Sequence, residues 1–402
     1  MKIKTFGPID SRAYDQLIRC AEKGKADFAV LCADHHVGYS QPIGGAIAYE
    51  NYISPSGVGY DIACGNKAVL TNLMVKDIPI SQVMDEIYSR ISFGIGRVNN
   101  EPVDHPVLDE IAHAEFAPQR KIIQKAEQQL GTVGSGNHYV DLFEDELGRL
   151  WVGVHFGSRG FGHTTASGFL ALSQGKEWGE KASEGEMDAP PTLLDVRTDL
   201  GQAYLTAMSL AGKYAYAGRD IVVNKVLEIL GALPVEEIHN HHNFAWREEH
   251  FGKNYWVIRK GCTPAQPGQK GFVGATMGDS SVILEGVDSQ EAKESLYSTV
   301  HGAGRVLSRT QAAGKKKWLR GEDGKKRPTI VKPGTVDWEK VLEGMKNKNI
   351  ELRGSGADEA PEVYKKLDEV LGFHKDSIKI LHKLKPIGVA MAGSEVFDPY
   401  KD

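Results

Sequence analysis

Helical spacing of apolar residues is plainest over residues 203–230, where the pattern runs up to Gly231. A second helix is expected over residues 117–130, with Gly131 at its end. Helices and strands are intermixed with many short loops, so we expect one compact domain of the α/β or α+β class, with mixed sheets, over residues 1–402. Short runs rich in β-branched and aromatic residues predict strands at 150–156, 254–258, 271–275 and 281–285.

Two segments interrupt this pattern without separating compositionally distinct halves. Residues 174–192 are acidic, contain glycine and end in a double proline, which predicts an exposed excursion. Residues 313–334 are basic and punctuated by glycine, and we expect them to form a basic surface excursion within the same domain.

The composition is that of an ordinary soluble globular chain, with 41% hydrophobic and 25% charged residues, and it excludes a disordered or collagen-like polymer. The net charge of −5 gives no reason, at the level of the whole protein, to expect nucleic-acid binding. Glycine is the exception, because its 45 copies in 402 residues exceed the usual ~7%. This surplus predicts long Gly-rich loops that bring the backbone close to a ligand.

The cysteines indicate a reduced, cytoplasmic protein. None of the four forms a C-x-x-C pair, and four thiols in 402 residues do not make a disulfide framework. No run approaches the ~18 apolar residues of a membrane-spanning helix, so we expect no membrane segment.

Potential metal ligands gather where strand-like runs meet glycines, in GVGYDIACG, GSGNHYVD, GVHFGSRG and the dense HNHHN segment. Each residue alone is more often a buried structural side chain, but their concentration on Gly-rich strand ends favours a metal site. One thiolate with imidazoles and a carboxylate suits zinc or manganese better than calcium or magnesium. A shared cysteine sulfur could bridge two ions, and paired metals suit phosphoryl chemistry. The candidate ligands are Asp61, Cys64, His138, His155 and His242.

A fifth cluster, HGAGR followed by Ser308 and Arg309, has the composition of an anion site. Its glycines allow backbone N–H groups to approach a phosphate, and a helix beginning here would place Arg305 and Arg309 on one face. A neutral His301 among phosphate-binding groups can act as a nucleophile on phosphorus or as a general acid or base. Without the arginines, a surface histidine before a helix would be the better reading.

The local charge downstream differs from the global one. Residues 301–332 contain ten Lys and Arg against two acidic residues, a balance of +8. Such a run is usually a solvated face. Next to a phosphate site, a binding surface for a polyanion is the better interpretation, because the release of counterions favours binding there. Lys315, Lys316 and Lys317 begin this run.

At this point the sequence resembles the RtcB-type RNA ligases. Six motifs, GVGYDIACG, GSGNHYVD, GVHFGSRG, HHNFAW, VIRKG and HGAGRVLSR, occur in the order of that family. The flanking segments DHHVGYSQPIGG at 34–45 and EAPEVYKKLDEV at 359–370 also resemble it, so the likeness covers about residues 30–390.

The resemblance implies a cytoplasmic enzyme of RNA repair or tRNA splicing. It would join RNA ends that carry a 2′,3′-cyclic phosphate or 3′-phosphate to 5′-hydroxyl ends, using GTP and two Mn²⁺ ions. His301 resembles the histidine that attacks the GTP α-phosphate and forms a covalent GMP-histidine. Asp61, Cys64 and His138 resemble the ligands of one manganese ion; Cys64, His155 and His242 resemble those of the second.

The resemblance also places the remaining site residues. Those expected to hold phosphates of the nucleotide or the RNA are Arg159, Lys260, Arg305 and Arg309. The basic run, independently of the resemblance, predicts Lys315, Lys316 and Lys317 as RNA contacts. Those expected to hold the guanylate are Asn137, His138, Asp141, His242, Asn243, Gly274, Ala275, Thr276, Met277, Ser281, His301, Gly302, Ala303 and Gly304.

Three positions depart from the family pattern. Asp141 stands where the family usually has glutamate, and 274–277 reads Gly-Ala-Thr-Met where the family reads Pro-Gly-Ser-Met. The family's terminal lysine, which reaches the guanine base, is absent at the matching position, since residues 388–393 read GVAMAG. We therefore expect a divergent member with a different nucleotide preference or rate, in which Lys401 or another group substitutes.

Two alternatives stay open. The altered base-contacting positions favour a metal-dependent RNA-end phosphoesterase that has lost nucleotidyl transfer, although the intact HGAGR motif argues against it. A non-catalytic RNA-binding module that uses the basic 313–332 segment is the other alternative.

Overall fold

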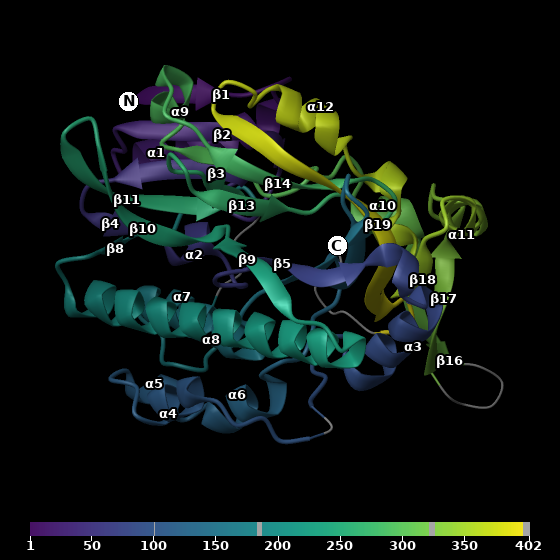
Figure 1. Cartoon of the computed structure of the whole chain (residues 1–402). Helices are drawn as coiled ribbons and strands as arrows, with labels where there is room; N and C mark the ends of the chain where they lie inside the picture. The colour runs from purple at the N-terminus through teal and green to yellow at the C-terminus, as the bar shows by residue number, and fades with distance from the viewer. Residues whose placement is uncertain (100, 183–186, 321–325, 397–402) are drawn as a thin grey trace.

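The largest sheet of the molecule has eight strands in the order β13, β14, β19, β6, β7, β5 and β9, with β18 paired to β19 outside this path (Figure 1). Its neighbours are antiparallel, except that β18 runs parallel to β19. The computed structural model describes residues 1–99, 101–182, 187–320 and 326–396. The strands are β5 (Gly65–Met74), β6 (Tyr139–Glu144), β7 (Arg149–Phe156), β9 (Pro234–His241), β13 (Lys270–Val273), β14 (Ser281–Gly286), β18 (Glu351–Ser355) and β19 (Ile378–Gly393).

A second sheet has five strands in the order β1, β2, β3, β11 and β10. Most of the residues of β2 and β3 are buried, so these two strands form part of the hydrophobic core rather than the surface. The strands are β1 (Lys2–Thr5), β2 (Phe28–His36), β3 (Ile43–Tyr49), β10 (Asn243–His250) and β11 (Lys253–Lys260).

The long helix α8 (Asp199–Leu230) confirms the strongest sequence pattern and begins four residues before the predicted start. Thr198 caps it, because its side chain accepts the Gly201 N–H, and Gly231 ends it in the left-handed conformation at φ +62°. Helix α8 contacts α7 (Arg159–Ser173) and β7. In Figure 1 these two helices lie beneath the strands, with α4, α5 and α6 beneath α8.

The remaining helices are shorter. They are α1 (Ser11–Lys23), α2 (Pro55–Val58), α3 (Ile80–Arg90), α4 (Pro106–Ala112), α5 (Ala117–Arg120), α6 (Ile123–Gln129), α9 (Gln290–Glu294), α10 (Arg309–Ala313), α11 (Trp338–Asn347) and α12 (Leu367–Gly372), with 3₁₀ turns at Val75–Asp77, Ala357–Glu359 and Pro361–Val363.

The expected single helix over 117–130 is two helices, α5 and α6. The break has a tertiary cause: the buried Gln119 amide donates to the Ala207 carbonyl and to Thr165, which fixes α5 against α7 and α8. The chain then restarts as α6, which buries Ala126, and the left-handed Gly131 (φ +80°) ends the segment as expected.

The four predicted strands are confirmed as β7, β11, β13 and β14, although β13 ends at Val273, two residues earlier than expected. Short pairs complete the fold: β4 (Tyr52–Ile53) with β8 (Leu194–Asp195), and β12 (Cys262–Pro264) with β15 (Ser298–Val300). This arrangement confirms the mixed α/β class. None of the described helices combines the length and the apolar character needed to cross a membrane.

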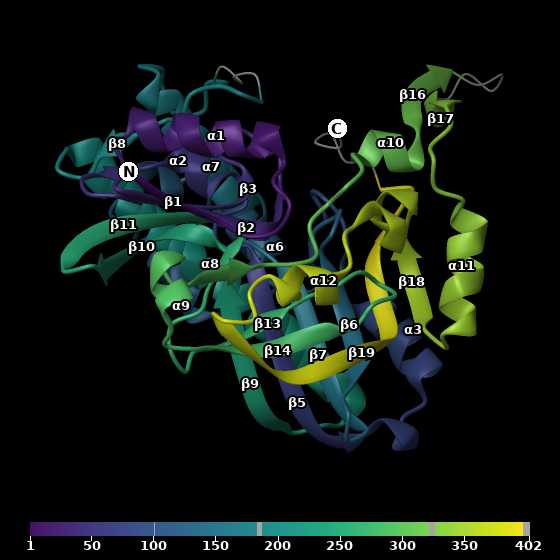
Figure 2. The same cartoon turned by 90° about the horizontal axis from the view of Figure 1, so that it is seen from above.

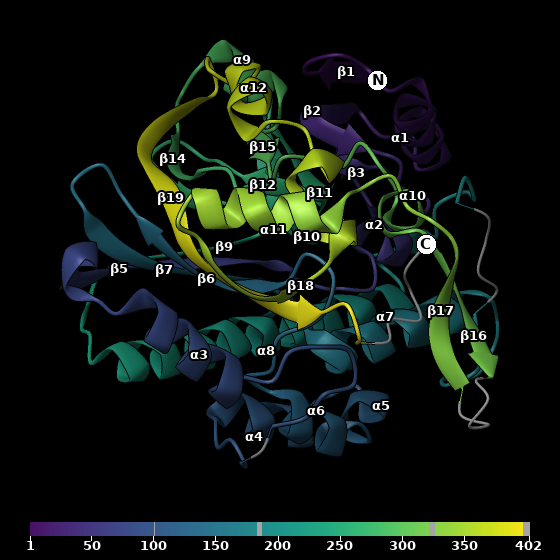
Figure 3. The same cartoon turned by 90° about the vertical axis from the view of Figure 1, so that its right-hand side faces the viewer.

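The basic 313–334 segment forms a two-stranded hairpin of β16 (Lys315–Arg320) and β17 (Lys326–Lys332). Figures 2 and 3 show this hairpin standing away from both large sheets, next to α10. Its exposed side chains include Leu319 and Ile330 as well as cations. The expected surface excursion is therefore a defined arm of the fold.

Candidate metal and nucleotide site

The pairing of β5 with β7 brings the candidate thiol and imidazole ligands together. Cys64 immediately precedes β5, and the antiparallel register sets Gly65 opposite Phe156 and Asn66 opposite His155. The Cys64 Sγ consequently lies 3.5 Å from the His155 Nε2. A side chain at position 65 would collide with the neighbouring strand, because a Cβ there would lie 2.3 Å from the Asn240 carbonyl oxygen.

All five predicted ligands lie in one cluster made of two sets. Asp61, Cys64 and His138 form one set and Cys64, His155 and His242 form the other, with the ligand atoms of each set within 4.8 Å of one another. The His138 Nε2 lies 3.2 Å from an Asp61 oxygen and 3.6 Å from the Cys64 Sγ. Both sets share Cys64, as expected for a sulfur that bridges two ions.

Asn66 determines which nitrogen of His155 faces the thiol. The His155 Nδ1 donates to the Asn66 carbonyl oxygen at 2.7 Å, and the Asn66 amide in turn donates to the Phe272 carbonyl at 3.0 Å. With its Nδ1 proton held in this way, the ring presents an unprotonated Nε2 to the cluster. Such an outer hydrogen bond is typical of histidines that bind metal ions.

The electrostatics of the cluster suit a divalent cation. Burial lowers the pKa of His155 and of His242 well below the usual value, so both rings are neutral ligands at physiological pH. Burial alone would raise the pKa of Asp61, but the hydrogen bond and charge of His138 lower it to about 2. Burial, and to a smaller extent the neighbouring Asp61, raise the pKa of the Cys64 thiol well above its usual value. A bound cation would offset the free-energy cost of forming the thiolate. The His242 Nδ1 is buried and has no hydrogen-bond partner among the residues that the structure describes.

His301 lies beside this cluster and is held by a carboxylate. Its ring centroid is 4.8 Å from that of His242. The His301 Nδ1 lies 2.6 Å from Oδ2 of Asp34, which also accepts the backbone N–H groups of His301 and Gly302. Burial would raise the pKa of Asp34, but His301 lowers it, so the carboxylate stays ionised. Since Nδ1 is engaged by Asp34, Nε2 is the ring nitrogen left to react.

A pocket opens next to His301 and contains most of the expected nucleotide contacts. The expected residues that line it are Asn137, Asp141, Gly274, Ala275, Thr276, Met277, His301, Gly302, Ala303 and Gly304, with Arg305 and Arg309 at the same pocket. The lining residues that sequence reasoning missed are His36, Asn66, Tyr139, Glu359 and Tyr364. Val389 and Met391, from the 388–393 stretch where the family has its base-contacting lysine, also line the pocket, as does His155, a predicted metal ligand.

Two other expected nucleotide contacts, Ser281 and Asn243, do not line the pocket but hold neighbouring backbone in place. The Ser281 hydroxyl accepts the Ala275 N–H at 3.0 Å and so shapes the 274–277 loop. The Asn243 amide donates to the backbone carbonyl of Asp61 at 3.3 Å and accepts the Gly261 N–H at 2.8 Å.

The helix that would set Arg305 and Arg309 four residues apart on one face does not begin at the HGAGR motif. Gly304 has φ +81°, and α10 begins only at Arg309, because Ser308 and Gln311 form a capping box there. Arg305 and Arg309 still converge on the same neighbours, since Arg305 donates to the Asp358 carbonyl and Arg309 pairs with the Asp358 and Glu359 carboxylates. Arg305 also lies 3.5 Å from a Glu359 carboxylate oxygen, so both predicted phosphate-binding arginines are already paired with acidic side chains.

The other two predicted phosphate contacts, Arg159 and Lys260, do not line this pocket. Arg159 begins α7 with φ +52°, and its guanidinium donates to the Gly94 carbonyl at 2.9 Å and to Thr132. The Lys260 ammonium donates to the Tyr39 and Ser56 carbonyls at 2.6 and 3.3 Å, and burial lowers its pKa to about 8.

Lys315 is exposed at the base of the β16–β17 hairpin. The side chains of Lys316 and Lys317, and the whole of Lys401, lie outside the described residues. The structure thus gives Lys315 a position open to a polyanion and gives none for the other three.

Asp34 is the most important site residue that sequence reasoning missed, because it holds the His301 ring. A signal was present, because Asp34 opens the polar DHH triplet directly after the apolar run of β2. Nothing local connects it to His301, which is 267 residues away.

The fold and the site together define a mixed α/β protein with a candidate two-metal centre next to a carboxylate-held histidine. Comparison with known proteins narrows this class to one family. The family model described as tRNA-splicing ligase RtcB matches residues 16–118 and 109–392.

Similar proteins cover nearly the whole chain. The RNA-splicing ligase RtcB of Escherichia coli K12 is 30% identical over 423 residues, 96% of each chain. The tRNA-splicing ligases RtcB of Archaeoglobus fulgidus and Thermococcus kodakarensis are 31% and 29% identical, each over 90% of this chain and 87% of the relative. The chain belongs to the RtcB family.

Proposed function

We propose that this protein is an RNA ligase that joins 2′,3′-cyclic-phosphate or 3′-phosphate RNA ends to 5′-hydroxyl ends, with GTP as co-substrate and two Mn²⁺ ions. The observation that carries the proposal is the position of His301: Asp34 holds one ring nitrogen at 2.6 Å, and the ring lies 4.8 Å from that of His242, a member of the shared-thiol cluster. The named activity of the relatives supports the same reaction class.

In the proposed first step the His301 Nε2 attacks the α-phosphorus of GTP. A nitrogen–phosphorus bond forms, the bond to the bridging oxygen of the β-phosphate breaks, and pyrophosphate leaves. The negative charge of Asp34 stabilises the imidazolium that develops as the nitrogen lone pair is donated, and its hydrogen bond keeps Nε2 free of a proton. The product is a GMP-histidine at His301.

An oxygen of the RNA 3′-phosphate then attacks the GMP phosphorus, the phosphorus–nitrogen bond to His301 breaks, and GMP is joined to the RNA 3′-phosphate by a phosphoanhydride. The 5′-hydroxyl of the second RNA end attacks that RNA phosphorus, loses its proton and displaces GMP. A cyclic phosphate must first be hydrolysed to the 3′-phosphate, which consumes one water.

The metal centre would be held by the two sets that share Cys64. Manganese bound there would withdraw charge from the phosphates and help the leaving group depart. Asn66 keeps the His155 Nε2 directed at the cluster, and Asp61 is held by the Ser158 N–H at 3.1 Å. These residues fix the ligands before any nucleotide enters.

The arginines and the hairpin would bind the RNA. Arg305 and Arg309 line the pocket and are held by Asp358 and Glu359, so a phosphate would have to exchange with these acidic partners. Lys315 follows α10 directly and begins the exposed basic hairpin. An RNA strand leaving the pocket along α10 would meet this arm, where phosphate contacts add salt-dependent affinity.

The test is the joining of a 3′-phosphate RNA to a 5′-hydroxyl RNA with and without Mn²⁺ and GTP, in parallel with labelling of the protein by α-³²P-GTP. We expect joined product only with both additions, and an acid-labile, hydroxylamine-resistant adduct that His301→Ala abolishes. Hydrolysis of the cyclic phosphate without any adduct would replace this proposal with the phosphoesterase. RNA binding that survives His301→Ala and metal removal, with no product, would replace it with the binding module.

A further inference from the structure

A buried arginine on α8 contacts both chain segments that carry the shared metal ligands. Arg219 is fully buried. Its Nη1 donates to two backbone carbonyls, that of Ala63 at 2.9 Å and that of Phe156 at 2.6 Å. A buried guanidinium is costly unless its hydrogen bonds are satisfied, so its presence here requires an explanation beyond packing.

The two carbonyls stand directly next to metal-ligating side chains. Ala63 precedes Cys64 and has φ +55°, a left-handed conformation that costs free energy for a residue with a side chain. Phe156 follows His155 and ends β7. The Arg219 Nη1 thus connects two segments. One is the strained turn at Ala63, which carries the Cys64 thiol, and the other is the end of β7 at Phe156, which carries the His155 imidazole.

These two segments meet at the seam of the candidate site. Gly65 pairs with Phe156 in the last rung of the β5–β7 ladder, and beyond this rung Asp61 accepts the Ser158 N–H at 3.1 Å. The β5–β7 ladder ends here, because the segments before Gly65 and after Phe156 leave the sheet. The Arg219 guanidinium supplies the next bridge, where a strand pair can no longer do so.

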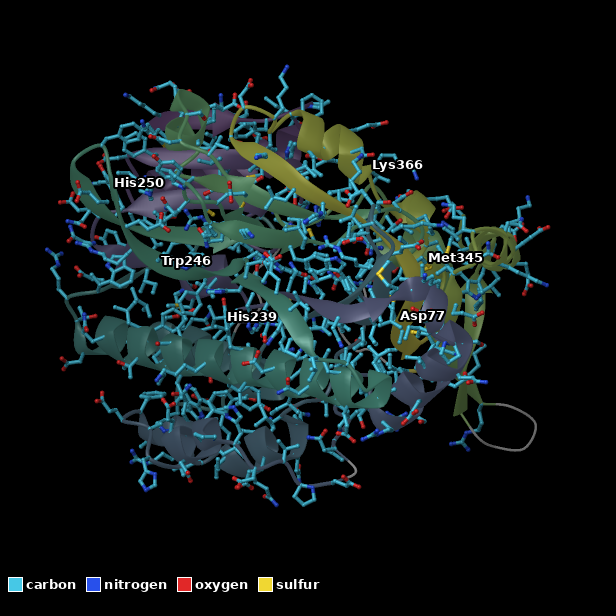
Figure 4. The ribbon with its side chains drawn as sticks, in the orientation of Figure 1. Asp77, His239, Trp246, His250, Met345 and Lys366 are labelled. Carbon is cyan, nitrogen blue, oxygen red and sulfur yellow. The ribbon has the colours of Figure 1, made fainter. Side chains whose placement is uncertain are left out.

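The Arg219 Nε is held as well, whereas Nη2 is buried without a hydrogen-bond partner among the described residues. The Arg219 Nε donates to the His239 Nε2 at 2.7 Å, and His239 stacks on Tyr216 with ring centroids 3.8 Å apart. Figure 4 shows His239 in the space between β9 and α8. His239, which stands within the dense HNHHN segment, therefore orients Arg219 and does not belong to either ligand set.

We propose that Arg219 is a positioning residue for the metal centre, whose guanidinium fixes the Ala63 and Phe156 carbonyls and thereby sets the separation of Cys64 from His155. The inference rests on the proposed function only in requiring that the cluster binds metal. Within the part of the chain that the structure describes, Arg219 makes no hydrogen bond to a ligand side chain. Its effect would be transmitted through two backbone turns.

The test is a Co²⁺ titration of the full-length protein, read by the thiolate-to-cobalt charge-transfer band and by the ligand-field bands of the ion. Arg219→Met removes both carbonyl bridges, and Arg219→Lys keeps a cation but cannot span both carbonyls with the same geometry. Loss of an outer hydrogen bond at a metal site typically costs about 10–100-fold in affinity. We expect a Kd raised in that range for Arg219→Met, and altered ligand-field bands in both variants.

Arg259→Lys is the matched control. Arg259 is also fully buried and donates to a backbone carbonyl, that of Leu296 at 2.7 Å, but its partner Glu248 is not a member of either ligand set. We expect Arg259→Lys to lower the melting temperature and to leave the cobalt spectrum and Kd unchanged. His239→Gln should weaken Co²⁺ binding less than Arg219→Met, since it leaves both carbonyl bridges in place.

Wild-type affinity and spectrum in both Arg219 variants would overturn the inference, as would an equal loss in Arg259→Lys. If Arg219→Met does not fold, the ligand-field bands of Arg219→Lys decide the matter alone. A wild-type protein that gives no thiolate band would instead refute the metal centre, and with it the proposed function.

Discussion

Replacing Asp34 with asparagine is expected to slow the transfer of GMP to His301 without removing the nucleophile. The carboxylate accepts three N–H groups, including the His301 Nδ1 at 2.6 Å, and it is fully shielded from solvent. Asparagine keeps the shape and one acceptor oxygen but loses the charge. Its amide can also donate to Nδ1, which would leave the proton on Nε2 and block attack.

The magnitude follows from the kind of hydrogen bond that is lost. A hydrogen bond to a charged group contributes about 1.5–3 kcal/mol, roughly twice a neutral one. The buried Asp34–His301 pair belongs at the upper end, because burial removes screening by water. A loss of about 3 kcal/mol in the transition state corresponds to a ~100-fold slower step.

The assay is single-turnover labelling of the protein by α-³²P-GTP with Mn²⁺, with metal content measured on the same samples. Asp145→Asn is the matched control, since Asp145 is also buried and accepts the Trp151 indole N–H at 3.0 Å, far from His301 in sequence. It should lower stability and leave the labelling rate unchanged. A wild-type rate in Asp34→Asn, or an equal loss in Asp145→Asn, would refute the reasoning.

Three further changes test separate parts of the molecule. Cys64→Ala should abolish metal binding and RNA joining together, because alanine offers no donor to either ligand set; metal analysis that finds two ions still bound would contradict this. Lys260→Met should remove a pH-dependent part of the folding stability. Burial lowers the pKa of Lys260 from 10.5 to about 8, so the free energy of unfolding of the wild type rises by up to about 3 kcal/mol between pH 8 and pH 10.5. Denaturant unfolding that shows the same dependence of stability on pH for both proteins would contradict this. Lys315→Gln should weaken RNA binding and flatten its dependence on salt while guanylylation is unchanged; an unchanged salt slope would assign Lys315 to solvated surface.

The parts of the fold that sequence could predict are those governed by local rules. Helix α8 has apolar spacing, a threonine cap and a glycine stop, all within one continuous segment. Four candidate metal ligands, Asp61, Cys64, His138 and His155, could be found because they stand in Gly-containing segments at strand ends. His242 could be found because it belongs to a dense run of histidines. The prediction of a single helix over residues 117–130 failed, because the break depends on Gln119, whose hydrogen-bond partners belong to α7 and α8.

The parts that could not be predicted depend on pairs far apart in the chain. Asp34 meets His301 across 267 residues, and Arg309 meets Glu359 across 50. Arg219 contacts Ala63 and Phe156 from the middle of an ordinary helical pattern. Periodicity reports which face of an element is buried, but not which polar group it meets there, so these contacts required the structure.

The pocket around Asp141 leads to a final prediction, that discrimination between GTP and ATP is weak. Burial raises the pKa of Asp141 well above its usual value, its Oδ1 has no partner among the described residues, and Val389 and Met391 line the same pocket. A neutral carboxyl offers one donor and one acceptor, which matches the edge of adenine, whereas guanine presents two donors and requires an ionised acceptor. Each mismatched hydrogen bond is worth about 1 kcal/mol, so labelling of His301 by α-³²P-ATP should reach within about tenfold of that by GTP. Asp141→Glu, which restores the residue usual in the family, should shift the ratio toward GTP; strict GTP dependence at an ordinary rate in the wild type would show that Asp141 is ionised when the nucleotide binds.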